Sequence, residues 1–219
     1  MTTAHAAHVR LFRSLHTPSA PLALANAWDA ASARVVEAAG APAVATTSAG
    51  VAWALGSPDG NTLDRDRALA ALAQVTAAVT VPVTADLEDG TRPPAGFAAR
   101  LTTARTAEHR LTETLSRAHR YVAAGADGIF VPGVTDPATI RAPAAEIPVP
   151  LKVMAGPGAP SVAELGRLGV ARVSLGSGVA QAAYAAARRA TRELLDGGTY
   201  ETLAEAVPYP EMQGLLAAR

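Results

Sequence analysis

Three acidic residues follow one short apolar segment of the chain. Val81–Ala85 is followed by Asp86, Glu88 and Asp89, and then by Gly90. An apolar run of this length is typical of a buried parallel strand, and α/β proteins place their chemistry where such strands end. Because side chains alternate along a strand, Asp86 and Glu88 point to one side, whereas Asp89 points away and is expected to cap the turn. Asp86 and Glu88 are therefore the predicted functional pair.

Neighbouring carboxylates repel one another, so this group of acids needs cationic partners to stay ionised. Two interpretations follow. The acids hold a metal ion, for which carboxylate oxygens are suitable ligands, or they form ion pairs with nearby arginines. The residues alone leave both interpretations open.

The composition narrows the class of protein. The chain has 219 residues, 49% of them hydrophobic, with 19 basic and 19 acidic residues and no cysteine. This length can bury the core of one domain. A net charge of zero argues against partners such as nucleic acid or an anionic membrane surface.

The missing cysteines exclude disulfides, thiolate zinc sites and a cysteine nucleophile. Residues 1–10 lack the apolar region of a secretory signal, and no apolar run approaches the length of a membrane span. We expect a soluble, cytoplasmic protein.

Short apolar runs alternate with helical patterns along the chain. Strands are expected at 22–25, 43–47, 81–85, 127–131, 151–154 and 170–175. Helices are expected at about 29–39, 64–79, 111–124, 135–145, 161–168 and 179–195. Residues 48–60 are expected to form a loop. This alternation indicates right-handed βαβ units and a parallel sheet, so the predicted fold class is α/β, with a single domain over 1–219.

Six segments then point to a known family. They are NAWDAASA at 26–33, TSAGVA at 47–52, LGSPDG at 55–60, PVTADLE at 82–88, AGADGIFVP at 124–132 and VARVSLG at 170–176. In this order, and over nearly the whole chain, they resemble the isocitrate lyase/phosphoenolpyruvate mutase superfamily. The resemblance implies a TIM-type (β/α)8 barrel and dependence on Mg²⁺. It also implies a lyase or mutase that acts on a small 2-oxo or 2-hydroxy carboxylic acid, or on a phosphonate, through a metal-bound enolate.

The resemblance assigns roles to individual residues. Asp86 matches the principal magnesium ligand, and Asp59 and Glu88 match acids that hold the ion largely through its waters. From the residues alone, a plain turn next to Gly60 also explains Asp59. A loop matches the segment whose backbone N–H groups receive the carboxylate of the substrate. Its residues are Thr47, Ser48, Ala49 and Gly50.

The chain departs from the family pattern after Gly90. Residues 91–110 cannot hold two complete strand–helix units, because one such unit takes about 30 residues. The barrel is therefore expected to be reduced around its fourth and fifth strands, and the fourth magnesium-associated acid to be absent. Arg105 matches a remnant of an arginine motif, with Ala107 in place of its aspartate, and is the predicted catalytic anion clamp. The alternative is a surface arginine on one continuous helix over 97–124. The lysine- and cysteine-containing catalytic loop of the true lyases is missing too, which argues against isocitrate or methylisocitrate cleavage.

Two main hypotheses result. The chain is a Mg²⁺-dependent enzyme of the lyase or mutase type that acts through an enolate, or it is a non-catalytic, reduced homologue that acts as a binding or partner protein. A third option is an enolate-forming enzyme with a new acid/base set. Members of the family exchange terminal helices between subunits, so the C-terminal helices over 179–219 are expected to cover a neighbour. We expect a homo-oligomer, a dimer or a tetramer.

Overall fold

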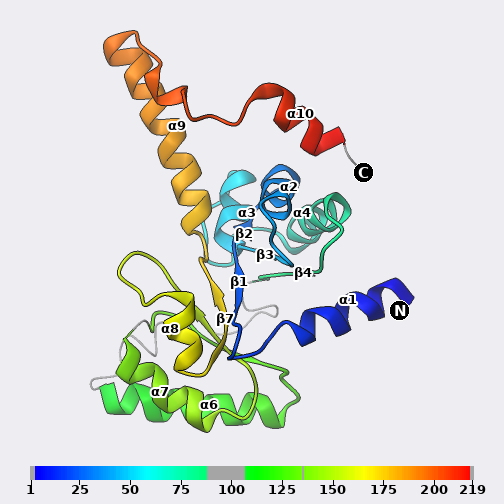
Figure 1. Ribbon diagram of the computed structural model, residues 1–219, viewed down its shortest axis with the longest axis vertical. Coiled ribbons are helices and arrows are strands. Elements are labelled where there is room, and N and C mark those ends of the chain that lie inside the picture. Colours follow the sequence, from blue (N-terminus) through cyan, green and yellow to red (C-terminus); the bar gives the residue numbers. More distant parts are fainter. Residues whose placement is uncertain (1–2, 88–106, 135, 218–219) are drawn as a thin grey trace. The chain divides into compact units, whose positions relative to one another are not determined.

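Strands and helices alternate along the protein, and the predicted α/β class is confirmed. The computed structural model describes residues 3–87, 107–134 and 136–217 (Figure 1). The strands are β1 (Leu22–Leu24), β2 (Asn26–Ala27), β3 (Val44–Thr46), β4 (Val83–Thr84), β5 (Ile129–Val131), β6 (Leu151–Met154) and β7 (Val170–Ser174). The helices are α1 (Thr3–Ser14), α2 (Ala30–Ala38), α3 (Ser48–Ala54), α4 (Arg65–Ala78), α6 (Ala107–Ala123), α7 (Pro137–Glu146), α8 (Val162–Arg167), α9 (Gly178–Gly197) and α10 (Tyr209–Ala217), with a 3-10 turn, η1, at Glu201–Leu203. In this part of the chain no helix is long and apolar enough to cross a membrane.

The described chain divides into two compact units, each with its own parallel sheet. The first unit comprises residues 1–24 and 89–175. Its four strands lie in the order β1-β7-β6-β5, and all their pairings are parallel. Side chains from β5, β6 and β7 and from helices α6, α7 and α8 form its core. The members that are most deeply buried are Ala118, Ile140, Leu165 and Val170.

The second unit comprises residues 25–88 and 176–219 and contains Asp86. Its sheet has the order β2-β3-β4, with Asn26 beside Ala45 and Val44 beside Val83. Its core is formed by Ala27, Ala33, Val36, Val44 and Val75. Helices α2 and α4 pack against each other, and α9 leads into a turn from which the chain returns, so that α10 contacts α2 (Figure 1).

Side-chain caps explain where several helices begin. Asp29 and Ser32 form a reciprocal capping box at the start of α2, and Ser161 and Glu164 form another at α8. Asp64 accepts hydrogen bonds from backbone N–H groups in the first turn of α4. These caps satisfy N–H groups that have no partner inside the helix, and they lie where the sequence predicts helix starts.

Three local predictions need correction. Residues 48–54, predicted as part of a loop, form helix α3. Asn26 and Ala27 form an additional short strand, β2. Helix α6 already includes Ala107, four residues before the predicted start at Leu111. The question of whether residues 90–106 form a strand or a helix lies outside the described residues.

Candidate functional site

The carboxylate of Asp86 accepts two hydrogen bonds from one residue, Ser48. The backbone N–H of Ser48 donates to Asp86 Oδ2 at 3.2 Å, and the Ser48 hydroxyl donates to the same oxygen at 3.0 Å. Ser48 begins α3 directly after β3, and Asp86 follows β4, which pairs with β3. The two residues therefore meet at the carboxyl ends of neighbouring parallel strands, as the sequence predicts for a functional site. Asp86 is exposed, so an ion from solution can reach it.

Two buried polar residues hold this edge of the sheet in place. The backbone N–H of Asp86 donates to Thr46 Oγ1 at 2.8 Å, and Asn26 Nδ2 donates to the carbonyl oxygen of Thr46 at 2.9 Å. Asn26 and Thr46 are each only 3% exposed. A buried polar group is costly unless it is hydrogen-bonded, so these contacts fix the ends of β2, β3 and β4 relative to one another. Neither Asn26 nor Thr46 is predicted as a site residue from the sequence, although each is a polar residue at the end of a short apolar run.

The start of α3 is packed too tightly for a larger residue. Thr47 caps the helix by accepting a hydrogen bond from the N–H of Gly50 at 3.5 Å. A Cβ atom added at Gly50 would lie 2.6 Å from Thr47 Cγ2 and 2.9 Å from Trp28 Cβ. Both distances are shorter than the contacts that Cβ atoms make in proteins, so a side chain at this position would clash. Ala180 of α9 lies next to the same position. The backbone that presents Ser48 is thus confined by its neighbours.

The predicted carboxylate-binding loop uses its N–H groups in different ways. The N–H of Thr47 donates to Ala27 O at 3.1 Å, and that of Gly50 serves the helix cap. The N–H of Ser48, by contrast, donates to a carboxylate. Of the four predicted residues, including Ala49, Ser48 is therefore the one whose donors are seen to hold a carboxylate.

The remaining predicted site residues are Asp59, Glu88 and Arg105. Asp59 lies exposed in the connection between α3 and α4. The adjoining Gly60 and Asn61 have positive φ angles of 97° and 62°, so Asp59 stands in a tight turn. Glu88 and Arg105 lie outside the described residues. Among residues 3–87, 107–134 and 136–217, no three His, Cys, Asp or Glu side chains lie close enough together to hold a metal ion. The predicted set of metal ligands also includes Glu88, which lies outside these ranges.

The chain matches a known protein family over most of its length. The family model described as phosphoenolpyruvate phosphomutase matches residues 12–107 and residues 97–195. The two matches overlap at residues 97–107, within the segment where the sequence predicts a shortened barrel.

Two solved structures from Burkholderia cenocepacia J2315 are similar to this protein. One is a protein provisionally described as a lyase/mutase, with 32% identity, a TM-score of 0.87, and coverage of 99% of this chain and 98% of that one. The other is provisionally described as a phosphonomutase, with 35% identity, a TM-score of 0.77, and coverage of 84% and 98%. A phosphonopyruvate hydrolase in complex with oxalate and Mg²⁺ shares the fold, with a TM-score of 0.76 but only 19% identity over 95% of this chain and 94% of that one.

A relative from Mycobacterium tuberculosis aligns with this chain only when gaps are introduced into the chain. The protein MT2054 of Mycobacterium tuberculosis (strain CDC 1551 / Oshkosh), described as uncharacterized, is 36% identical over 251 residues, with 94% of this chain and 95% of the relative covered. Since this chain has 219 residues, an alignment of 251 positions requires gaps in it. The relative therefore carries residues that this chain lacks.

Proposed function

This chain belongs to the phosphoenolpyruvate phosphomutase family, and from that membership we propose that it is a Mg²⁺-dependent lyase or mutase. Its substrate is a small 2-oxo or 2-hydroxy carboxylic acid, or a phosphonate, and the reaction passes through an enolate. The superfamily and the barrel-type α/β fold class predicted from the sequence are confirmed by the matches. The observation that carries the proposal is the contact between Ser48 and the Asp86 carboxylate where β3 and β4 end.

The Asp86 carboxylate, exposed where β4 ends, is the group that we propose as the magnesium ligand. Asp86 would hold Mg²⁺ directly, and Asp59 and Glu88 would hold it through water. Carboxylate oxygens are the hard ligands that Mg²⁺ prefers, and the ion usually keeps several waters. When bound, the ion would supply Lewis-acid stabilisation of the oxygen that becomes negative in the enolate.

Ser48 would bind the carboxylate of the substrate. Its N–H and hydroxyl already hold one carboxylate oxygen, that of Asp86. A substrate carboxylate is the same kind of acceptor, and hydrogen bonds to a charged oxygen are stronger than neutral ones. If the Asp86 carboxylate held the ion, the two donors of Ser48 would be available to the carboxylate of the substrate. Arg105 would clamp the second anionic group.

The similar structures support this choice of ligands. The phosphonopyruvate hydrolase that shares the fold binds oxalate together with Mg²⁺. Oxalate is a mimic of the enolate of pyruvate, since two adjacent oxygens chelate the metal in both. The structure described as a lyase/mutase, at 32% identity, supports the same class of reaction.

A specific observation favours a second candidate function, a reduced homologue that binds a ligand without turning it over. The relative from M. tuberculosis carries residues that this chain lacks, and the two family matches meet at 97–107. If the missing residues supply the acid/base groups, the chain would retain binding and lose catalysis.

Proton exchange in deuterium oxide tests the enolate chemistry. We expect the methyl protons of pyruvate to exchange with solvent in the presence of the protein and Mg²⁺, which ¹H NMR detects as loss of the methyl signal. Exchange should stop when Mg²⁺ is chelated and in Asp86→Asn, but not in Asp66→Asn, an exposed acid in the first turn of α4. Absence of exchange in a protein that still binds Mg²⁺ and oxalate would favour the second candidate.

We also propose that the protein is a homo-oligomer, a dimer or a tetramer, built through the C-terminal helices. Large apolar side chains of this region are exposed in the single chain. They are Leu194, Leu195, Tyr200, Leu203, Val207, Tyr209 and Leu216. Burial of such side chains against a second copy would be favourable.

A further inference from the structure

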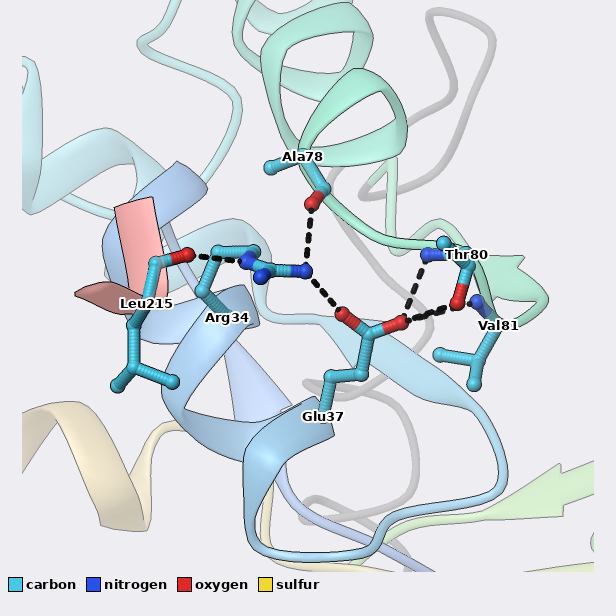
Figure 2. Close-up of polar contacts among 6 residues, drawn as sticks. All are labelled: Arg34, Glu37, Ala78, Thr80, Val81 and Leu215. Carbon is cyan, nitrogen blue, oxygen red and sulfur yellow. Dashed lines mark hydrogen bonds and ion pairs between the residues drawn. The ribbon is translucent and has the colours of Figure 1, made fainter. Parts of the chain in front are cut away.

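The guanidinium of Arg34, in α2, joins two helix ends and one acid (Figure 2). Its Nε donates to the carbonyl oxygen of Leu215 at 2.6 Å, and its Nη1 donates to Glu37 Oε2 at 2.7 Å and to the carbonyl oxygen of Ala78 at 3.4 Å. Ala78 is the last residue of α4, and Leu215 lies in the last turn of α10. Carbonyl groups at helix C-termini lack partners inside the helix and carry partial negative charge, so a cation stabilises both ends.

The carboxylate of Glu37 holds the connection that leads into β4. Its Oε1 accepts hydrogen bonds from Thr80 N at 2.7 Å, Thr80 Oγ1 at 2.8 Å and Val81 N at 3.3 Å (Figure 2). The next residue, Pro82, accepts a hydrogen bond from Val44 N at 2.9 Å, which starts the pairing of β4 with β3. Glu37 therefore fixes the chain immediately before the strand whose end carries Asp86.

The two side chains form one mostly buried ion pair. The Arg34 side chain is 15% exposed and that of Glu37 is 14% exposed. Removal of one partner from a buried pair leaves an uncompensated charge, which then disturbs the groups that the other partner holds. The planar guanidinium also has a fixed arrangement of donors, so its contacts to α10 and to Glu37 are not independent of each other.

Helix α10 has few other means of attachment. None of its described side chains is buried, and Tyr209 is 76% exposed. An element with little buried apolar surface opens at low free-energy cost. Within one chain, the hydrogen bond from Arg34 to Leu215 is thus a specific anchor for a helix that the apolar packing of that chain holds weakly.

We infer that Arg34 and Glu37 are positioning residues that couple the docking of α10 to the α4–β4 connection, and through β4 to Asp86. When α10 leaves its place, Arg34 loses one acceptor and shifts, Glu37 loses its fixed partner, and the start of β4 loosens. The last step, from β4 to metal binding at Asp86, rests on the proposed function; the coupling between α10 and β4 does not.

Hydrogen–deuterium exchange on the full-length protein tests the coupling. Glu37 reaches α10 through Arg34, so Glu37→Gln should raise exchange about tenfold both in residues 79–84 and in α10. Arg34→Lys, which keeps the charge but loses the fork of donors, should raise exchange in the same two segments. Arg67→Lys is the matched control, because Arg67 of α4 also donates to a carbonyl group, that of Leu55, but in an exposed contact. This variant should leave the exchange of both segments unchanged.

A rise in residues 79–84 alone in both variants, with α10 unchanged, would overturn the coupling. Mg²⁺ affinity of the same variants tests the link to Asp86, and we expect it to fall about fivefold in Glu37→Gln and Arg34→Lys but not in Arg67→Lys. Unchanged affinity in the first two would overturn that link. If the wild-type protein binds no Mg²⁺, the proposed function fails, whereas the exchange data still decide the coupling.

Discussion

At the scale of single residues, Asp86 is held from two sides by its neighbours on β3 and α3. Ser48 donates to its carboxylate, and Thr46 accepts from its backbone N–H. The first contact involves exposed groups, so solutes can reach them. The second is fixed, because Thr46 is buried. Thr46 therefore fixes the position of the Asp86 backbone, from which the carboxylate side chain extends.

Substitution of Thr46 tests this role. In Thr46→Val the shape is nearly kept, but the partly buried N–H of Asp86 loses its acceptor, and the loss of such a hydrogen bond costs about 0.5–1.5 kcal/mol. We expect urea denaturation to show a loss of this size and Mg²⁺ affinity to fall about tenfold, which corresponds to 1.4 kcal/mol. Thr46→Ser keeps the hydroxyl and should retain the wild-type affinity. Equal Mg²⁺ affinities of the two variants would contradict the role of the hydroxyl.

The sequence predicts Ser48 and Asp86 as site residues, and the structure brings the two together, but the sequence does not predict the contacts of Asn26 and Thr46. The acids after Val81–Ala85 stand out because charged side chains follow an apolar run there. Asn26 and Thr46 matter through pairing with residues distant in the sequence, Asn26 with Ala45 and Thr46 with Asp86. No local pattern reveals such partners, and a polar residue at the end of a strand is common.

At the scale of elements, prediction succeeded where a repeating pattern and a cap agree, and it missed two short elements, α3 and β2. Helix α4 has Asp64 as its cap and is long enough for the pattern to be recognised. Helix α3 has seven residues, of which Ala49, Gly50, Val51 and Ala52 are all buried. With four consecutive buried residues there is no polar face to reveal a helical period. Strand β2 has only two residues, and its existence depends on β3.

The ion pair of Glu37 predicts a pH dependence of stability. Burial alone would raise the pKa of the Glu37 carboxyl, but hydrogen bonds from Thr80 and Val81 and the nearby Arg34 guanidinium outweigh it and hold the pKa below its ordinary value. A group with a lowered pKa in the folded state stabilises the protein above its unfolded pKa, and this contribution is lost as the pH falls through the folded pKa.

We therefore expect the free energy of unfolding of the wild type to exceed that of Glu37→Gln by a constant amount above about pH 5.5. The difference should shrink steadily as the pH falls below the ordinary carboxyl value of 4.5. Urea denaturation between pH 3 and pH 7 measures both curves. A difference that does not change with pH would mean that the Glu37 carboxylate has no special stabilisation in the folded state.

At the scale of the whole molecule, the C-terminal region combines a fixed turn with exposed apolar side chains. Glu193, near the end of α9, accepts hydrogen bonds from Thr202, Thr199 and Glu201, which lower its pKa to about 2. This carboxylate connects the end of α9 to the turn that follows it. Leu195, before the turn, is 77% exposed, and Leu203, after it, is 55% exposed. A second copy of the chain is the partner that we propose for this surface.

Light scattering coupled to size-exclusion chromatography tests the proposed assembly. We expect the mass of a dimer or a tetramer for the wild type, and a shift toward the monomer in Leu195→Glu combined with Leu203→Glu, because the charges would be buried in the interface. Leu11→Glu, at an exposed leucine of α1, is the control and should keep the wild-type mass. A monomeric wild-type protein at micromolar concentration would contradict the proposed oligomer.

Calorimetric titration of oxalate, with and without Mg²⁺, tests the central claim most directly, namely that Asp86 and Ser48 belong to a metal-dependent carboxylate site. We expect oxalate to bind the wild type in the presence of Mg²⁺, and to lose most of its affinity when Mg²⁺ is chelated or in Asp86→Asn. Asp66→Asn, in the first turn of α4, should bind as the wild type does. Absence of oxalate binding at millimolar concentration, or binding that needs neither Mg²⁺ nor the Asp86 carboxylate, would contradict the proposed site.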